Sequence, residues 1–255
     1  MDLEAYLRRI AYEGEREPTV DVLRGLHLAH VRSVAFENSS VLRGEPIILD
    51  GTRLVSKIVD AGRGGFCYEL NGAFAELLRA VGFGVELLPA RTWSDTRLGP
   101  PFEHLCLSVN VGGEPFLVDV GAGFSFVEPL RLVVGLEQAD PNGRFRIVRP
   151  ADDAAQLEVE WLHRDGVWRP HYRFEPRAVA LAEFAATCEW LRTSSESPFT
   201  IGWRCARALR DGYATLDARR LIISEAGSRE TIELDDDTAL ARALEAWFGI
   251  TESGP

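Results

Sequence analysis

Cys67 lies in the segment Arg63-Gly-Gly-Phe-Cys-Tyr-Glu-Leu-Asn71 and has the sequence surroundings of a reactive thiol. Apolar residues recur at three- and four-residue steps from Leu70 to Val81, so we expect a helix that begins at or near Cys67. The N-terminus of a helix favours negative charge, and the thiolate is the nucleophilic form of cysteine. The two glycines suit a tight turn or a backbone that lies close to a ligand. The alternative is a buried, unreactive thiol, which is what most free cysteines are.

His104 and Asp119 lie on two segments that we expect to form a hairpin. Residues 104–111 and 115–120 read as strands, and Gly112-Gly113 between them is a turn signal. Pairing across this turn can place Asp119 beside the strand of His104, and a buried carboxylate needs such a partner. Together with Cys67 this gives a nucleophile, a base and a carboxylate that orients the base. We interpret Cys106, in the middle of a strand, as a core residue.

Composition narrows the class of protein. The chain has 255 residues, 46% of them hydrophobic, and a net charge of −11 with pI about 5.0, which argues against nucleic acid or an anionic membrane surface as a partner. We find neither a signal-peptide core nor an apolar run of membrane-spanning length, and the four separated cysteines indicate no metal site and no disulfide framework. We therefore predict a cytoplasmic protein with reduced thiols. Lys57 is the only lysine, a bias towards arginine that hints at a GC-rich bacterial genome.

The periodicity predicts three segments in an α+β arrangement. Residues 1–83 read as helices, with Thr52 as the N-cap of the third, and residues 84–176 read as strands of a small antiparallel sheet or barrel. Residues 177–255 mix helices, two of them expected at 179–191 and 202–209, with strands at 213–223 and 228–234 and a last helix at 237–248. We expect solvated or capping roles for His27 and His30 and local hydrogen bonds for His163 and His171.

The sequence resembles the arylamine N-acetyltransferase family. The resemblance rests on five features in the family's order and spacing, and it covers most of the chain: Val34-Ala-Phe-Glu-Asn38, Arg63-Gly-Gly-Phe-Cys-Tyr-Glu-Leu-Asn71, His104, Val118-Asp-Val-Gly-Ala-Gly123 and, more weakly, Thr193-Ser-Ser-Glu-Ser-Pro-Phe-Thr200. It implies a helical bundle, a central β-barrel and a C-terminal α/β lid around a core like that of cysteine proteases. It also implies that Cys67 takes an acetyl group from acetyl-CoA as a thioester, with His104 as base and Asp119 as its orienting partner.

The same resemblance suggests where the substrates bind. Acetyl-CoA would be a co-substrate rather than a tightly bound cofactor, and an arylamine or arylhydrazine would accept the acetyl group in ping-pong order. We expect Gly121 and Gly123 to let acetyl-CoA approach the backbone and an acceptor pocket to be lined by Phe36, Phe66, Ala122 and Phe124. Ala122 stands where many members of the family have phenylalanine, which should widen the acceptor side.

Other interpretations stay open at this point. An amide synthase of the same family, releasing a polyketide chain as a macrolactam, would share the three residues. Transglutaminase- or papain-like enzymes order them alike but lack the Arg-Gly-Gly and Phe-Glu-Asn motifs, and a non-catalytic binding module is the third class. The oligomeric state is open, with a homodimer as one option. We further expect Arg63 to pair with Glu37 as a buried structural brace.

Overall fold

A computed structural model describes residues 1–94, 96–163, 165–225 and 227–251. The remaining residues, 95, 164, 226 and 252–255, belong to the predicted second and third segments and lie outside the described residues. The predicted segment boundaries after residues 83 and 176 stay predictions.

The N-terminal part is helical, and its longest helix carries Cys67 as the first residue. The helices are α1 (Leu3–Arg9), α2 (Val20–Ser33), α3 (Ser39–Leu42), α4 (Gly51–Val59) and α5 (Cys67–Val81). Asp50 caps α4 by accepting a hydrogen bond from the N–H of Arg53 at 3.0 Å, so the prediction that Thr52 is the cap is wrong by two residues. Gly82 ends α5 in the left-handed conformation, where glycine has no steric penalty.

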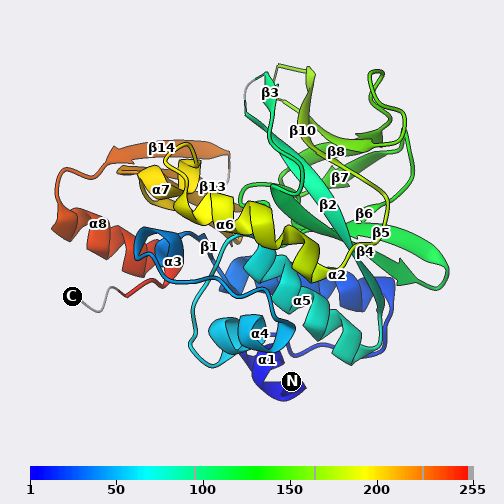
Figure 1. Cartoon of the computed structure of the whole chain (residues 1–255), viewed down its shortest axis with the longest axis horizontal. Coiled ribbons are helices and arrows are strands. Elements are labelled where there is room, and N and C mark those ends of the chain that lie inside the picture. The colour runs from blue at the N-terminus through cyan, green and yellow to red at the C-terminus, as the bar shows by residue number, and fades with distance from the viewer. Residues whose placement is uncertain (95, 164, 226, 252–255) are drawn as a thin grey trace.

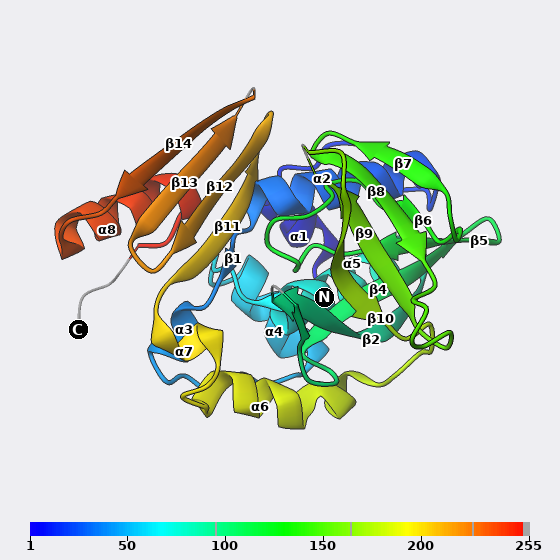
Figure 2. The ribbon, with the colours of Figure 1, turned by 90° about the horizontal axis from the view of Figure 1, so that it is seen from above.

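The central strands form one antiparallel sheet that curls into a nearly closed barrel (Figures 1 and 2). Its order is β6-β5-β4-β2-β10-β9-β8-β7, with β3 paired to β2. The strands are β2 (Gly84–Ser94), β3 (Arg97–Leu98), β4 (His104–Val111), β5 (Glu114–Val118), β6 (Leu130–Arg131), β7 (Glu137–Asp140), β8 (Gly143–Val148), β9 (Leu157–Leu162) and β10 (Trp168–Phe174). The expected hairpin between β4 and β5 is confirmed, with both turn glycines at positive φ.

The C-terminal part forms the lid and contributes four strands to a five-stranded antiparallel sheet, with helices at both ends of its sequence. Its elements are a 3₁₀ turn (Leu181–Phe184), α6 (Ala185–Thr193), α7 (Pro198–Ile201), β11 (Arg204–Leu209), β12 (Gly212–Asp217), β13 (Arg220–Glu225), β14 (Ser228–Glu233), α8 (Asp237–Ala243) and a π-helical turn (Leu244–Phe248). The sheet order is β1-β11-β12-β13-β14, so β1 (Phe36–Glu37) from the N-terminal part forms its edge. Figure 2 shows this sheet standing beside the barrel.

Two predictions for the lid are wrong. The helix expected at 202–209 is strand β11, because it pairs with β1 on one side and with β12 on the other and so gains ladder hydrogen bonds on both edges. The single strand expected at 213–223 is the hairpin of β12 and β13, whose turn includes Ala218 at φ 54°.

The main hydrophobic core lies around α5. This helix packs against α1 and α4 on one side and against β2 and β4 on the other (Figure 1). Leu70, Phe74, Leu77 and Leu78 have no exposed surface. The barrel interior and the space between the lid sheet and α8 hold two further clusters of buried apolar residues. Because α5 is fixed on both sides, its first residue is held in a defined place between helices and barrel.

Candidate active site

The start of α5 is held by contacts that require the two glycines before it. A Cβ on Gly64 would collide with the carbonyl oxygen of Ala35, and one on Gly65 would lie 2.7 Å from Oε2 of Glu69. Glu69 accepts a hydrogen bond from the N–H of Phe66 at 3.2 Å and forms an ion pair with Lys57 at 2.6 Å. The glycines therefore allow a close approach of the protein's own backbone and side chains, which fixes where α5 begins.

Cys67 lies at the N-terminus of α5 and is nearly buried, with 3% of its surface exposed. Its Sγ is 3.7 Å from the carbonyl oxygen of Glu103, the residue before β4. Tyr68 anchors the same segment, because its hydroxyl donates to the carbonyl of Phe102 at 2.6 Å. Cys67 is also one of the groups that raise the pKa of the His104 ring. The structure thus places Cys67 beside the first residue of β4.

His104 and Asp119 form a buried, hydrogen-bonded pair. Nε2 of His104 lies 2.6 Å from Oδ2 of Asp119, and each residue is 2% exposed. Burial alone would lower the pKa of His104, but the Asp119 carboxylate and Cys67 outweigh it and raise this pKa to about 10. Burial alone would raise the pKa of Asp119, yet His104 and further hydrogen bonds keep that pKa below its ordinary value. The pair is therefore an imidazolium and a carboxylate at neutral pH.

Asn71, one turn into α5, connects the helix to the loop that follows β5. Its Nδ2 donates to Oδ1 of Asp119 at 2.8 Å and to the carbonyl of Leu105 at 2.6 Å, and its Oδ1 accepts the N–H of Val120 at 2.9 Å. The N–H of Gly121 donates to the same Oδ1 of Asp119 at 2.9 Å. Both carboxylate oxygens of Asp119 are thus satisfied, as a buried charge requires.

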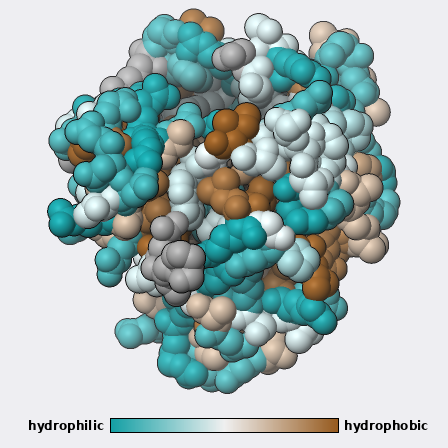
Figure 3. Space-filling model, turned by 60° about the vertical axis from the view of Figure 1, so that its left-hand side comes forward, coloured by the Kyte–Doolittle hydropathy of each residue, from teal (hydrophilic) through white to brown (hydrophobic). Residues whose placement is uncertain are grey.

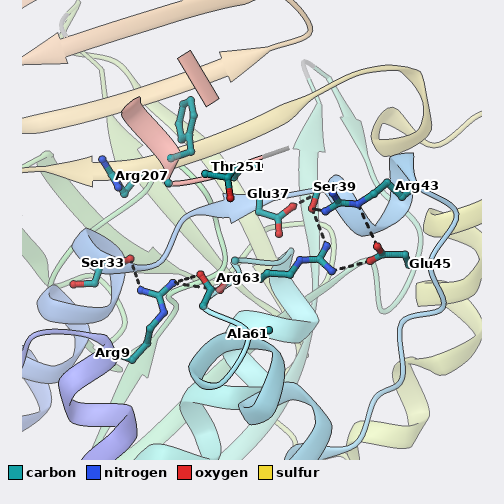
Figure 4. A pocket seen from close by; sticks show the side chains of 15 residues that line it. Arg9, Ser33, Glu37, Ser39, Arg43, Glu45, Ala61, Arg63, Arg207 and Thr251 are labelled. Carbon is teal, nitrogen blue, oxygen red and sulfur yellow. Dashed lines mark hydrogen bonds and ion pairs between the residues drawn. The ribbon is translucent and has the colours of Figure 1, made fainter. Parts of the chain in front are cut away.

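Arg63 does not pair with Glu37, so that prediction is wrong. Its guanidinium donates to Glu45 at 2.8 Å and to the hydroxyl of Ser39 at 2.9 Å (Figure 4). It also donates to the hydroxyl of Ser40 at 2.9 Å. Glu37 is 2% exposed and accepts the N–H of Ser39 instead, at 2.5 Å. Arg63 still connects the loop before α5 to α3. The carboxylate that pairs with it belongs to Glu45, which lies outside the motifs named in the sequence.

The predicted glycine and pocket residues occupy different environments. A Cβ on Gly121 would lie 2.8 Å from Cα of Cys67, so this glycine lets the loop pack directly on the start of α5. Gly123 has φ +73°, where a side chain would be strained. The aromatic residues and the alanine differ in exposure: Phe66 is fully buried, Phe36 and Ala122 are partly buried, and Phe124 lines a cavity of about 800 Å³ with Trp161.

His27 and His30 are fully buried, so the solvated or capping roles expected for them are wrong. His27 hydrogen-bonds to the backbone of Asp119, a contact that sequence reasoning missed although the signal was present. His27 falls on the helix face defined by Leu23 and Leu26, at the three- and four-residue steps that mark buried positions. His171 bonds to the hydroxyl of Ser125 at 3.0 Å rather than to a neighbour in the sequence.

Among the residues that the structure describes, the remaining chemistry-bearing groups do not form a second centre. Burial raises the pKa of the Cys106 thiol well above its ordinary value, which fits a core residue. Within the described ranges, no group of three or more His, Cys, Asp and Glu side chains is arranged to hold a metal ion.

Among the helices of the described part, none combines the length and the apolar character needed to cross a membrane. Figure 3 shows a largely hydrophilic face with apolar residues gathered near its centre.

Comparisons with known proteins show the family of this chain. A family model described as N-acetyltransferase matches residues 19–253. The arylamine N-acetyltransferase of Mycolicibacterium smegmatis is 34% identical, and the match covers 98% of this chain and 92% of that protein. The arylamine N-acetyltransferase of Escherichia coli is 32% identical, and the match covers 97% of this chain and 88% of that protein. The structure of the Mycobacterium marinum enzyme in complex with CoA superposes with a TM-score of 0.91 at 33% identity, covering 98% of this chain and 93% of that one. This chain therefore belongs to the arylamine N-acetyltransferase family.

Proposed function

We propose that this enzyme moves an acetyl group from acetyl-CoA to an arylamine or arylhydrazine through a thioester on Cys67. The observation that carries the proposal is the position of Cys67, whose Sγ lies 3.7 Å from the carbonyl oxygen of Glu103, directly before His104, while the His104 ring is bonded to Asp119 at 2.6 Å. The solved relative that binds CoA supports acetyl-CoA as the donor. We do not propose the amide synthase, because the relatives reported above are arylamine N-acetyltransferases.

The first half-reaction follows from the charges of the site. With the proton already on His104, Cys67 reacts as the thiolate and attacks the carbonyl carbon of acetyl-CoA. The C–S bond to CoA then breaks, and the imidazolium returns its proton to the CoA thiolate, which leaves as the thiol. During the attack, first-turn N–H groups of α5 can stabilise the oxyanion, because they have no partner within the helix. Neutral His104 and acetylated Cys67 remain.

The second half-reaction reverses the proton transfer. The amine nitrogen attacks the thioester carbonyl, and His104 takes the proton that the nitrogen loses. The C–S bond to Cys67 breaks, which releases the amide and restores the thiolate and the imidazolium. Asp119 stabilises that imidazolium in both halves of the cycle. Four further points stay predictions. They are the binding of acetyl-CoA beside Gly121 and Gly123, the homodimer, the cytoplasmic location, and an acceptor pocket lined by Phe36, Phe66, Ala122 and Phe124.

Mass spectrometry of the intact protein tests the proposal. After incubation with acetyl-CoA we expect one added acetyl group in the wild type and in Cys106→Ala, and none in Cys67→Ala. An unmodified wild type, or an adduct that maps to Cys106, would refute the assignment of the nucleophile.

A further inference from the structure

His27 occupies a buried position in the middle of α2. It has no exposed surface, and its ring stacks on Phe126, with centroids 6.0 Å apart and planes at 18°. The edge of Phe74 in α5 approaches the ring from another side, at 6.1 Å and 82°. Such an apolar environment is unfavourable for an imidazole unless both of its nitrogens find hydrogen-bond partners.

Both ring nitrogens of His27 bond to the backbone of the loop that follows β5. Nδ1 lies 2.8 Å from the carbonyl oxygen of Val127, and Nε2 lies 3.3 Å from the backbone nitrogen of Asp119 and 3.1 Å from its carbonyl oxygen. Burial is the largest influence on this ring and lowers its pKa, although the charge of Asp119 opposes the shift. In the neutral ring, Nδ1–H donates to Val127 and Nε2 accepts the N–H of Asp119.

This arrangement completes the set of bonds that fix Asp119. Asn71 and the N–H of Gly121 hold Oδ1 of the carboxylate, and His104 holds Oδ2. His27 holds the main chain from which that carboxylate extends, and through Val127 it ties the far end of the same loop to α2. We propose that His27 is a positioning residue that holds Asp119 in register with His104 and thereby sets the reactivity of Cys67.

The role of His27 deepens the proposed function, because it concerns the same three residues. It predicts an effect on the Cys67 thiolate that can be measured without any acyl donor. If Asp119 moves, it stabilises the imidazolium less well, so the thiolate persists over a narrower pH range. Misplacement of a catalytic group by about 1 Å can lower the reaction rate around a hundredfold. We therefore expect the loss of the His27 contact to lower kcat for acetyl transfer by ten- to hundredfold.

The chain offers a matched control on the same helix. His30 is also fully buried, but its Nε2 lies 3.2 Å from the hydroxyl of Tyr6 and its Nδ1 has no partner among the described residues. In the described part of the chain, no hydrogen bond joins His30 to Asp119. His27→Leu and His30→Leu therefore remove the same group from the same helix, and only the first removes a contact with Asp119. His27→Gln keeps an amide oxygen that can accept the N–H of Asp119.

The experiment measures the rate at which iodoacetamide alkylates Cys67 in the full chain between pH 5 and 10, with peptide mapping to assign the adduct. We expect His27→Leu to lower the alkylation rate at pH 7 and to narrow the pH range over which Cys67 reacts. His27→Gln should restore much of the rate and of the pH range. His30→Leu should keep the wild-type pH profile despite a lower Tm. A wild-type profile in His27→Leu, or the same change in His30→Leu, would overturn the proposal.

Acetyl transfer is measured on the same variants to separate this inference from the proposed function. If the wild type transfers no acetyl group but His27→Leu still alters alkylation, the function is wrong and the positioning role stands. If the wild type transfers acetyl and neither the alkylation profile nor kcat changes in His27→Leu, the function stands and the positioning role is wrong.

Discussion

Replacing Gly121 with alanine tests how closely the loop after β5 packs on the nucleophile. The added Cβ would lie 2.7 Å from Nδ2 of Asn71, 2.8 Å from Cα of Cys67 and 3.0 Å from the Cys67 carbonyl oxygen. Two of these three atoms are backbone of α5, which is packed on both sides and cannot yield locally. Overpacking of this kind costs about 1–3 kcal/mol. At roughly 2–4 °C per kcal/mol for a chain of this size, Tm should fall by roughly 2–12 °C.

Thermal unfolding and steady-state kinetics measure the two consequences of Gly121→Ala. We expect a lower Tm together with a lower kcat, because the displaced loop carries Asp119. Gly84→Ala is the control, since a Cβ at Gly84 would meet no atom closer than 3.9 Å. If Gly121→Ala kept its Tm and kcat and only raised the KM for acetyl-CoA, the glycine would serve the ligand and the packing explanation would be wrong.

Three further perturbations test the contacts around the site. In a double-mutant cycle on unfolding free energy we expect Arg63 to couple with Glu45 by about 0.5–1 kcal/mol and not with Glu37, and coupling to Glu37 would contradict the observed pairing. Asn71→Leu leaves two buried backbone groups without a partner and should cost on the order of 3 kcal/mol in urea unfolding and most of the activity; a wild-type midpoint would contradict the bonds assigned to Asn71. The raised pKa of His104, about 10 in the folded chain, means that its contribution to stability is complete below about pH 6.5 and is lost as pH rises towards 10. Unfolding free energies from pH 6.5 to 10 should fall in the wild type and fall less in His104→Gln, and parallel curves would refute this linkage.

The sequence was most informative where local signals and chemistry agreed. The two glycines before Cys67 and the helical period after it predicted where α5 begins, and Gly112-Gly113 predicted the hairpin that brings Asp119 to His104. These features depend on short-range turn chemistry and on periodicity, which a single sequence records.

What could not be predicted depended on contacts between distant segments. Strand β11 reads as a helix by its local pattern, but its pairing with β1, about 170 residues earlier in the sequence, makes it a strand. The choice of Glu45 over Glu37 as the partner of Arg63 depends on how the loop around α3 folds back. The hydrogen-bond partners of His27 also lie far away in the sequence, by 92 and 100 residues, although its burial on the face of Leu23 and Leu26 was predictable from the helical period.

Acetyl transfer in two separate steps is the most direct test of the central claim. The enzyme is incubated with radiolabelled acetyl-CoA, freed from all CoA by rapid desalting, and then mixed with an arylamine. We predict that label stays with the wild-type protein after desalting, is absent from Cys67→Ala, and passes to the amine in a single turnover. Label that never stays with the protein, while acetylated amine forms only when acetyl-CoA and amine are present together, would contradict a Cys67 thioester.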